Sequence, residues 1–446
     1  MIRQVGEALA GASWAKLSPP AKEKLKHCVI ANFSVALAGL PYVRLPEPAA
    51  SQDGHFLFSG RRAASAREAA FWNAAVMHAR TQDDFHPVGN LHAATVMLPA
   101  AMAAAEATEA SGERFLDALV AGYTAAAGLS CAFSPRTTPK GLRSTSLYSS
   151  FGSVASAGRL AGLDAAGLGN AVALAASVAG GFTQCWVDGS DEWQLHVAQA
   201  AANGLLAVEL TRAGVRGGEH ALDGKAGFYH AHAGALPTFE DIARDFDIDR
   251  AVLDTVIKRY PVSGICQPLV RLAERLAAQS AVNAGEIERV TIAMNPFEMR
   301  YPGTLNRGPF RSFSDVLMSA AFCCASVLAC GRFDFADLFN LDRRDRNRLI
   351  NATEVHDDPS LPTLSCRIEL RLKDGRKVSD TLIDGGRELA IDASSIDEWA
   401  LGLWREAGRS EAQYRAFRAA VDVLERGTAR QLLETLLLQL GPRPAR

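Results

Sequence analysis

The periodicity of the apolar residues changes once along the chain, near residue 245. Before that point almost every apolar stretch has helical spacing and ends on or near a glycine, as helices commonly do. The helices predicted in this part cover residues 19–40, 112–130, 149–163, 165–181 and 194–214. Small residues dominate them, and alanine favours helix intrinsically, so these helices can approach one another closely in a compact bundle.

Beyond residue 245 the pattern becomes mixed. Residues 286–296 alternate and carry β-branched side chains, which predicts a strand, and residues 365–384 predict a hairpin that turns at Asp374-Gly375. Helical spacing returns at residues 312–330, 333–340, 394–408 and 426–441. The pattern therefore predicts a mainly α protein with a large helical domain, a smaller α+β domain, and terminal helices that are able to rejoin the first domain.

The composition limits the class of protein. The chain has 446 residues, of which 48% are hydrophobic and 22% charged, as is usual for a soluble globular protein. Its net charge of −2 argues against a nucleic-acid partner, because such partners normally require a basic excess. No signal-peptide pattern opens the sequence, and Glu, Arg or Gly interrupts each alanine run before it reaches membrane-spanning length. We therefore expect no membrane partner and a cytoplasmic location.

One short stretch concentrates chemically active side chains. His78, Asp83, Asp84, His86 and His92 directly precede an alanine-rich run that predicts a helix. Proton-transfer chemistry, a metal site and capping of that helix are three interpretations of this stretch. No HExxH-like spacing supports a metal, and the eight cysteines contain no CxxC pair, so we expect no bound metal ion. The residues alone leave capping and chemistry open.

Five segments follow one another in an order that carries more information than any of them alone. They are "EAAFWNAAVMHARTQDDFHPVGNLHAATVMLPAAMAAAE", "STSLYSSFGSVASAGRLAGLD", "QLHVAQAAANGLLAVELTRAGVRGGEHALDGKAGF", "IKRYPVSGICQPLVRLA" and "RSFSDVLMSAAFCCASVLACG". In this order and spacing, the chain resembles the MmgE/PrpD family over roughly residues 20–385.

The resemblance implies a fold and a chemistry. The fold is a multihelical domain built from both chain ends, residues 1–248 and 390–446, with a smaller α+β domain, residues 249–389, inserted between them. It also implies a homodimer, an active site between the domains and no organic cofactor. The family's activities include 2-methylcitrate dehydration, cis-aconitate decarboxylation and iminodisuccinate epimerisation. Each makes or protonates a carbanion next to a carboxylate, which requires a positioned base, a role that suits histidine, and groups that stabilise negative charge.

Individual residues carry over from the family's motifs with several departures. The positions expected to be catalytic are His92, the paired Asp83 and Asp84, Lys258, and Tyr301. The positions expected to contact substrate are Phe85, His86, Arg143, Trp193, His196 and Gln267. The departures are Arg143 and Gln267 in place of histidines, Trp193 in place of a lysine, Gly264 in place of an arginine, Thr81 in place of an aspartate and Phe85 in place of a threonine.

These departures make the expected pocket more aromatic and less charged than the family pattern. We therefore expect the substrate to be a small carboxylate other than 2-methylcitrate, citrate or aconitate. The expected function is that of a cofactor-independent lyase or isomerase, dehydratase-like or decarboxylase-like. The alternatives are an epimerase or intramolecular cyclase of a specialised pathway, or a family member that binds a ligand without turnover.

Overall fold

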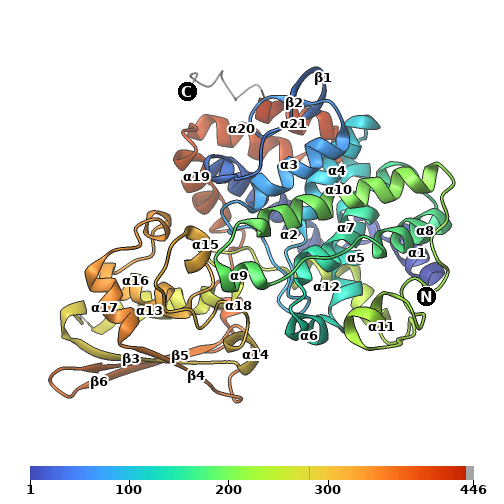
Figure 1. The fold of residues 1–446 in the computed structure, drawn as a ribbon. Helices are drawn as coiled ribbons and strands as arrows, with labels where there is room; N and C mark the ends of the chain where they lie inside the picture. Colours follow the sequence, from blue (N-terminus) through green and yellow to red (C-terminus); the bar gives the residue numbers. More distant parts are fainter. Residues whose placement is uncertain (281, 438–446) are drawn as a thin grey trace. The chain divides into compact units, whose positions relative to one another are not determined.

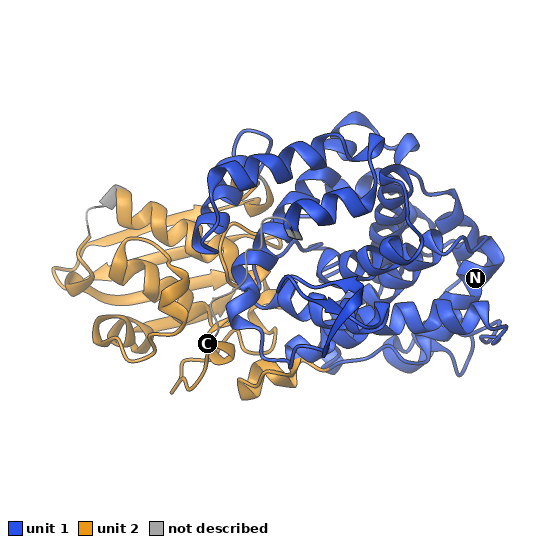
Figure 2. Cartoon of the chain, turned by 90° about the horizontal axis from the view of Figure 1, so that it is seen from above, with its two compact units in different colours: residues 1–181, 193–257, 391–446 blue, residues 182–192, 258–390 orange. Residues whose placement is uncertain are grey.

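The chain forms two compact units, each of which is described here by itself. The computed structural model describes residues 1–280 and 282–437. Unit 1 comprises residues 1–181, 193–257 and 391–446, and unit 2 comprises residues 182–192 and 258–390 (Figures 1 and 2). The predicted fold class, mainly α with a smaller α+β part, is confirmed. Residues 182–192 group with unit 2 although the expected bounds of the inserted domain, 249–389, do not include them.

The secondary structure in the described part of unit 1 consists of helices and one short hairpin. Its α-helices are α1 (Ile2–Gly11), α2 (Pro19–Gly39), α3 (Ala66–His78), α4 (Ala94–Ala107), α5 (Gly112–Ser130), α6 (Ser134–Thr137), α7 (Ser144–Leu160), α8 (Ala165–Ala176), α10 (Glu192–Arg212), α11 (Phe228–Ala233), α12 (Ile248–Leu253), α19 (Ile396–Glu406), α20 (Glu411–Asp422) and α21 (Ala429–Leu437). The hairpin pairs β1 (Ala50–Phe56) with β2 (Arg62–Ala63) in antiparallel fashion.

Small residues let the central helices of unit 1 pack backbone to backbone. A Cβ atom added to Gly122 of α5 would lie 2.2 Å from Ser156 Oγ of α7 and 2.4 Å from Met97 Sδ of α4. One added to Gly152 of α7 would lie 2.9 Å from the carbonyl oxygen of Gly122. Any larger residue at these two glycines would force the three helices apart, so the close approach predicted from composition is confirmed.

The end of the chain packs on its beginning within unit 1. Helix α19 contacts α2, where the indole Nε1 of Trp404 donates a hydrogen bond to Ser34 Oγ at 3.0 Å. Trp404, Phe33 and Phe417 form aromatic contacts in the same buried cluster. The helix predicted over residues 426–441 begins at Ala429, and its residues after 437 lie outside the described residues.

Unit 2 is built around a four-stranded sheet with the order β4-β3-β5-β6. The strands are β3 (Ile287–Met294), β4 (Thr353–Asp357), β5 (Cys366–Leu372) and β6 (Lys377–Leu382). Its helices are α9 (Gln184–Asp188), α13 (Gln267–Ser280), α14 (Pro296–Met299), α15 (Phe313–Val316), α16 (Ala320–Cys330), α17 (Arg344–Asn351) and α18 (Gly385–Glu388). Figure 1 shows α13, α16 and α17 on one face of this sheet.

Local patterns explain most of unit 2. Strands β5 and β6 form the predicted hairpin, and Gly375 takes the left-handed backbone conformation, φ +88°, at its turn. Strand β3 lies between β4 and β5, pairing parallel with β4 and antiparallel with β5. The single helix expected over residues 312–330 is two helices, α15 and α16. Ser319 is the N-cap of the second, and its Oγ accepts a hydrogen bond from the Phe322 N–H at 3.0 Å.

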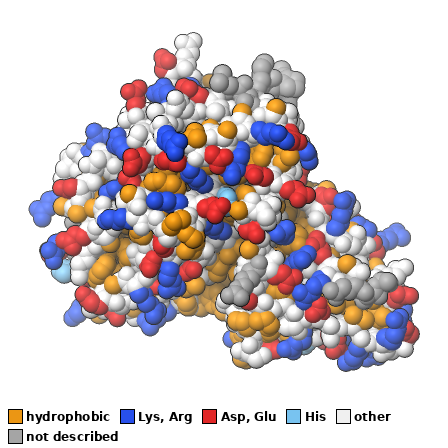
Figure 3. Space-filling view, turned by 180° about the vertical axis from the view of Figure 1, so that it is seen from behind, with side chains coloured by type: hydrophobic (Ala, Val, Ile, Leu, Met, Phe, Trp, Pro, Cys, Tyr) orange, Lys and Arg blue, Asp and Glu red, His pale blue; other side chains and the backbone are white. Residues whose placement is uncertain are grey.

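The described helices, taken singly, differ from membrane-spanning segments in length or hydropathy. Among the described residues, no single helix is long and apolar enough to cross a membrane. One bent pair of helices, residues 112–130 with 134–140, reaches that length and hydropathy together, by length and composition only. The face drawn in Figure 3 carries acidic and basic side chains intermixed.

Candidate active site

The stretch between α3 and α4 folds back on itself in unit 1 and gathers the predicted acid–base residues. Helix α3 begins with a capping box between Ser65 and Glu68 and ends at His78. Thr81 then takes a left-handed backbone conformation, φ +52°, which turns the chain sharply. This turn brings Asp83 back beside His78, five residues earlier in the chain.

A short hydrogen-bonded loop over residues 86–91 leads the chain to His92. The backbone N–H of His86 donates to the carbonyl oxygen of Leu91 at 2.8 Å, which closes a small loop over residues 86–91. Across from it, Phe85 and Val256 exchange two backbone hydrogen bonds of 2.8 and 2.9 Å. His92 therefore stands two residues before the first residue of α4, close to Asp83 and Asp84, which precede the loop.

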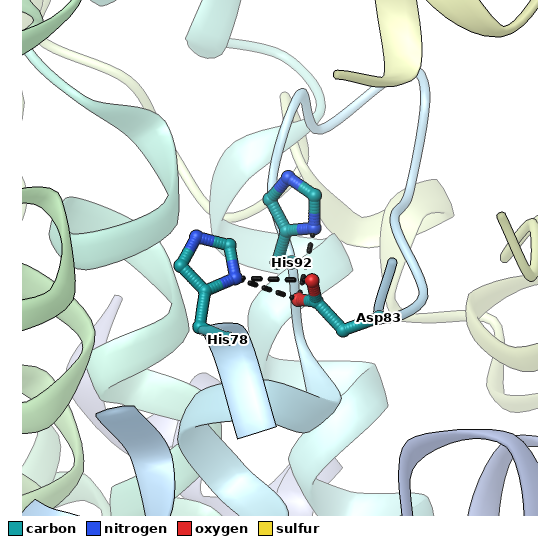
Figure 4. Close-up of side chains that lie close together, drawn as sticks. All are labelled: His78, Asp83 and His92. Atoms are coloured by element: carbon teal, nitrogen blue, oxygen red, sulfur yellow. Dashed lines mark hydrogen bonds and ion pairs between the residues drawn. The ribbon is translucent and has the colours of Figure 1, made fainter. Parts of the chain in front are cut away.

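Asp83 accepts from two imidazole rings. His78 Nδ1 lies 3.0 Å from both carboxylate oxygens, and His92 Nδ1 lies 3.1 Å from Asp83 Oδ2. Figure 4 shows that each ring turns one nitrogen toward the carboxylate and the other nitrogen away from it. The carboxylate and the His78 side chain are buried, whereas the His92 side chain is 19% exposed. Of the three, only His92 reaches the surface of unit 1.

The hydrogen bonds determine where the proton of His92 sits. Its Nδ1 also lies 2.9 Å from the backbone carbonyl oxygen of Asp84, which can only accept a hydrogen bond. The Nδ1 atom must therefore carry a proton, and in the neutral ring the lone pair is on Nε2. The His92 backbone is held as well: its N–H donates to Thr145 Oγ1 (3.3 Å), and its carbonyl accepts from Ser149 Oγ (3.1 Å).

The adjacent carboxyl group has a different environment. Asp84 Oδ2 accepts hydrogen bonds from the Tyr123 hydroxyl and from Asn32 Nδ2, and its Oδ1 accepts from the Ala94 N–H at the start of α4 (3.3 Å). Burial raises the pKa of Asp84 to about 6. The side chain thus anchors the start of α4, while the backbone of the same residue orients His92. The anchoring of α4 is thus observed, and the catalytic role expected for Asp84 stays a prediction.

Aromatic side chains surround the two imidazoles. The Trp193 ring of α10 meets His78 edge to face at 5.3 Å between centroids, and Phe85 lies 6.2 Å from His92. The two imidazoles themselves are 5.0 Å apart. Trp193 and Phe85 are both buried. Both aromatic departures therefore lie beside the cluster, and the contact with substrate expected for Phe85 and Trp193 stays a prediction.

Two other predicted residues of unit 1 lie outside this cluster. His86 Nδ1 accepts a hydrogen bond from the Gly89 N–H at 3.1 Å, and burial lowers the pKa of His86 to about 4. With Cys131 it lines a separate cavity of about 30 Å³. His196 is half-buried on α10, three residues after Trp193, and a Cβ added to Gly181 would lie 3.3 Å from its ring. The substrate-binding roles of His86 and His196 stay predictions.

The remaining predicted residues belong to unit 2. Lys258 is buried, and Tyr301 is half-buried just after α14. The Gln267 amide bonds to its own loop: Nε2 donates to the carbonyls of Tyr260 (2.8 Å) and Val262 (3.1 Å), and Oε1 accepts from the Tyr260 N–H (3.0 Å). The roles of Lys258, Tyr301 and Gln267 in catalysis or binding stay predictions.

His78 belongs to the stretch singled out from the sequence, but it was expected neither among the catalytic nor among the substrate-binding residues. The signal that was available is a histidine ending an apolar helical run, "FWNAAVMH", five residues before an aspartate. What the pattern could not show is its second partner, Arg143, which is 65 positions away.

The same cluster is the place where a metal ion would be considered. His78, Asp83 and His92 present ligand atoms that lie within 4.8 Å of one another. A metal needs a lone pair on the coordinating nitrogen, yet Nδ1 of His92 carries a proton that the Asp84 carbonyl accepts. The hydrogen bonds therefore favour protons over a cation at this position.

Comparisons with known proteins agree with the five ordered segments. The MmgE/PrpD N-terminal domain family matches residues 3–239, which is more than half of the chain. The cis-aconitate decarboxylase-like protein oryM of Aspergillus oryzae is 25% identical over 452 residues, covering 94% of this chain and 93% of its own length. The cis-aconitate decarboxylase of Homo sapiens is 25% identical over 367 residues, covering 78% of this chain and 70% of its own length. The resemblance is confirmed, and the chain belongs to the MmgE/PrpD family.

Proposed function

We propose that this protein is a lyase or isomerase of the dehydratase or decarboxylase type, which transfers a proton next to the carboxylate of a small acid. Two curated relatives are named for cis-aconitate decarboxylase, which supports an activity of this general type. The observation that carries the proposal is the environment of His92. Its Nδ1 is held by the Asp83 carboxylate and the Asp84 carbonyl, and Nε2 is the ring atom turned away from them (Figure 4).

In the proposed mechanism, His92 Nε2 exchanges a proton with the substrate carbon or with the leaving group. A ring that accepts a proton at Nε2 becomes an imidazolium, and the Asp83 carboxylate at 3.1 Å stabilises that positive charge. The same carboxylate and the Asp84 carbonyl hold the ring in one orientation, so Nε2 keeps its direction throughout the proton transfer. No cofactor is needed for this step.

The proposed substrate is a small carboxylic acid with few charges, not 2-methylcitrate. The support is that Trp193 lies beside His78 and Phe85 beside His92, where the family pattern has a lysine and a threonine. A buried aromatic ring supplies no positive charge for an additional carboxylate, as a lysine would. We also propose, from the family, a homodimer in the cytoplasm.

Deuterium exchange tests the proposal directly. The protein is incubated in heavy water with a panel of acids, cis-aconitate and 2-methylcitrate among them together with small mono- and dicarboxylates, and label at the carbon next to the carboxylate is measured by mass spectrometry. We expect enzyme-dependent label in a small acid. Exchange together with formation of an isomer, without loss of water or carbon dioxide, would indicate an epimerase or isomerase. Binding without exchange in any acid would contradict the proposal and favour a ligand-binding protein.

A His92 variant tests the assigned atom. His92→Asn should fold normally but lower the exchange rate by roughly 10²-fold or more, the usual scale for losing a general acid or base. The matched control is His230→Asn, since His230 is an exposed histidine of the same unit, on α11, and should leave the rate unchanged. A normal rate in His92→Asn, or a melting temperature that collapses with the rate, would remove His92 from the proposed role.

A further inference from the structure

Arg143 is a buried cation that contacts His78 and the backbone carbonyl of Trp193. It is the residue immediately before α7 and is 3% exposed. Its Nη2 lies 2.7 Å from His78 Nε2, and its Nη1 donates to the carbonyl oxygen of Trp193 at 2.6 Å. Its backbone N–H donates to the Gly181 carbonyl at 3.0 Å. Both terminal nitrogens of the guanidinium are thus engaged with groups of unit 1.

The contact with His78 determines the state of that ring. A guanidinium has donors and no acceptor, so His78 Nε2 must be the acceptor in the 2.7 Å contact. The ring is then neutral with its proton on Nδ1, the atom that faces Asp83. Burial lowers the pKa of His78 to about 3, which agrees with a neutral ring. An imidazolium, or the other tautomer, would point an N–H at the N–H of Arg143.

The state of His78 in turn orients Asp83. The Nδ1 atom of His78 lies 3.0 Å from both carboxylate oxygens of Asp83, so this ring fixes the orientation of the carboxylate. Oδ2 is then directed at His92 Nδ1. Four side chains, Arg143, His78, Asp83 and His92, form one row of hydrogen bonds that runs from a buried cation to the partly exposed imidazole. A guanidinium is always charged in proteins, so the buried end of this row carries a permanent positive charge.

We propose that Arg143 is a positioning residue that acts on His92 through His78 and Asp83, and that it is not an anchor for the substrate's carboxylate. The sequence predicted the anchor role for this arginine. The two roles differ in kinetics: an anchor contributes to substrate binding, whereas a positioning residue contributes to the proton-transfer step. The kinetic part of the proposal rests on the function proposed above, and its structural part does not.

The test uses three substitutions of one residue in the full chain. Arg143→Lys keeps the charge and a donor, Arg143→Gln keeps a donor without the charge, and Arg143→Met removes both. The control, Lys140→Met, removes one positive charge from an exposed side chain three residues earlier. Melting temperatures are recorded for all four, and the Lys and Gln variants keep the test usable if the Met variant does not fold.

The structural readout is the ¹⁵N NMR spectrum of protein labelled at histidine. In the wild type we expect His78 and His92 each to show a protonated Nδ1 and an unprotonated Nε2. In Arg143→Gln or Arg143→Met the His78 pattern should change, and in Arg143→Lys it should be largely restored. Unchanged ring signals in the Gln and Met variants would overturn the proposal, whether or not the protein is an enzyme.

The kinetic readout is the split between kcat and KM for the best exchanging acid. We expect kcat in Arg143→Gln to fall between about 10- and 100-fold, the scale of a small misplacement of a reacting group, with KM changed less than about twofold. Arg143→Lys should recover most of the loss. A raised KM with an unchanged kcat would show an anchor and overturn the proposal. If the wild type exchanges no acid, the proposed function fails, and the NMR result alone decides the role of Arg143.

Discussion

Two loops of the molecule carry residues assigned to chemistry from the sequence, and they use their polar groups in different ways. In unit 1, residues 78–92 pair side chain with side chain, because His78 and His92 both donate to Asp83. In unit 2, residues 258–267 pair a side chain with backbone, because the Gln267 amide bonds to Tyr260 and Val262. A side chain that closes its own loop contributes stability, whereas a carboxylate that holds Nδ1 of His92 fixes the tautomer and the direction of that ring. The comparison therefore separates a candidate for catalysis from a candidate for structure.

The largest effect is expected from Asp83→Asn, because Asp83 is the residue that both imidazoles of the unit 1 loop contact. The amide nitrogen of asparagine cannot accept from Nδ1–H of either ring, so at least one ring must change its tautomer or move. We expect kcat to fall roughly 10²-fold or more, as when the aspartate that orients a catalytic histidine is replaced. The measurement is the exchange rate together with the melting temperature. The control is Asp53→Asn, an exposed carboxylate of β1, and a rate within twofold of wild type in Asp83→Asn would contradict the prediction.

In the unit 2 loop, residues 258–267, we expect a substitution of Gln267 to lower the stability. Gln267→Ala leaves the Tyr260 N–H and the Tyr260 and Val262 carbonyls without their amide partner in a buried turn. The free energy of unfolding should fall by about 1–3 kcal/mol, the usual cost of leaving buried hydrogen-bonding groups unsatisfied. Denaturant unfolding measures this change, with the exposed Gln52→Ala as control. A fall in kcat/KM of more than about tenfold at unchanged stability would instead support the substrate-binding role expected for Gln267.

Much of the fold follows from patterns that are local in sequence. Helices α2 and α5 and the β5–β6 hairpin were predicted almost to their ends, since their apolar spacing and their end signals lie within each segment. Strand β4 was not predicted, because "TEVHD" is short and mostly polar and takes its place in the sheet by pairing with β3. The break between α15 and α16 depends on one capping serine inside an apolar run.

The candidate site divides in the same way. The resemblance brought forward Asp83 and His92, and the structure shows them in contact. Contacts of the polar end of a side chain are not encoded by apolar spacing. His78 was therefore left without a role, and Arg143 was assigned to the substrate although its guanidinium meets His78 and the Trp193 carbonyl. These contacts join segments that are far apart in the chain, and only the packing of α3, α7 and α10 reveals them.

Within unit 1, two buried histidines and the buried Asp84 should change the stability in opposite directions as the pH falls. Burial lowers the pKa of His78 to about 3 and that of His86 to about 4, below the value of about 6.5 for an unfolded chain. Between these values the unfolded chain binds more protons, so these two groups make stability fall as the pH is lowered below about 6.5. Asp84 acts in the opposite direction, since burial raises its pKa to about 6 from 3.8, and its contribution to stability rises as the pH falls through that window.

A variant that removes the opposing group tests this account. In Asp84→Asn the two histidines act without compensation, so the melting temperature should fall more steeply between pH 6.5 and pH 4.5 than in the wild type. Asp53→Asn, which changes an exposed carboxylate, should follow the wild-type slope. A slope in Asp84→Asn that is equal to the wild-type slope, or shallower, would show that Asp84 does not hold a proton in this range.

The smallest effect is expected from removing metal ions. The ligand atoms of His78, Asp83 and His92 are close enough to hold a cation, within 4.8 Å of one another. To bind it, His92 Nδ1 would have to lose the proton that the Asp84 carbonyl accepts at 2.9 Å, and His78 would have to move its proton to Nε2, against the N–H of Arg143 at 2.7 Å. Both shifts oppose the hydrogen bonds of the site. We therefore expect no stoichiometric metal after dialysis against a chelator, and unchanged exchange and melting temperature. A rate that is lost on chelation and restored by zinc or manganese would show that the cluster binds a cation, and that the row from Arg143 to His92 carries a metal in place of protons.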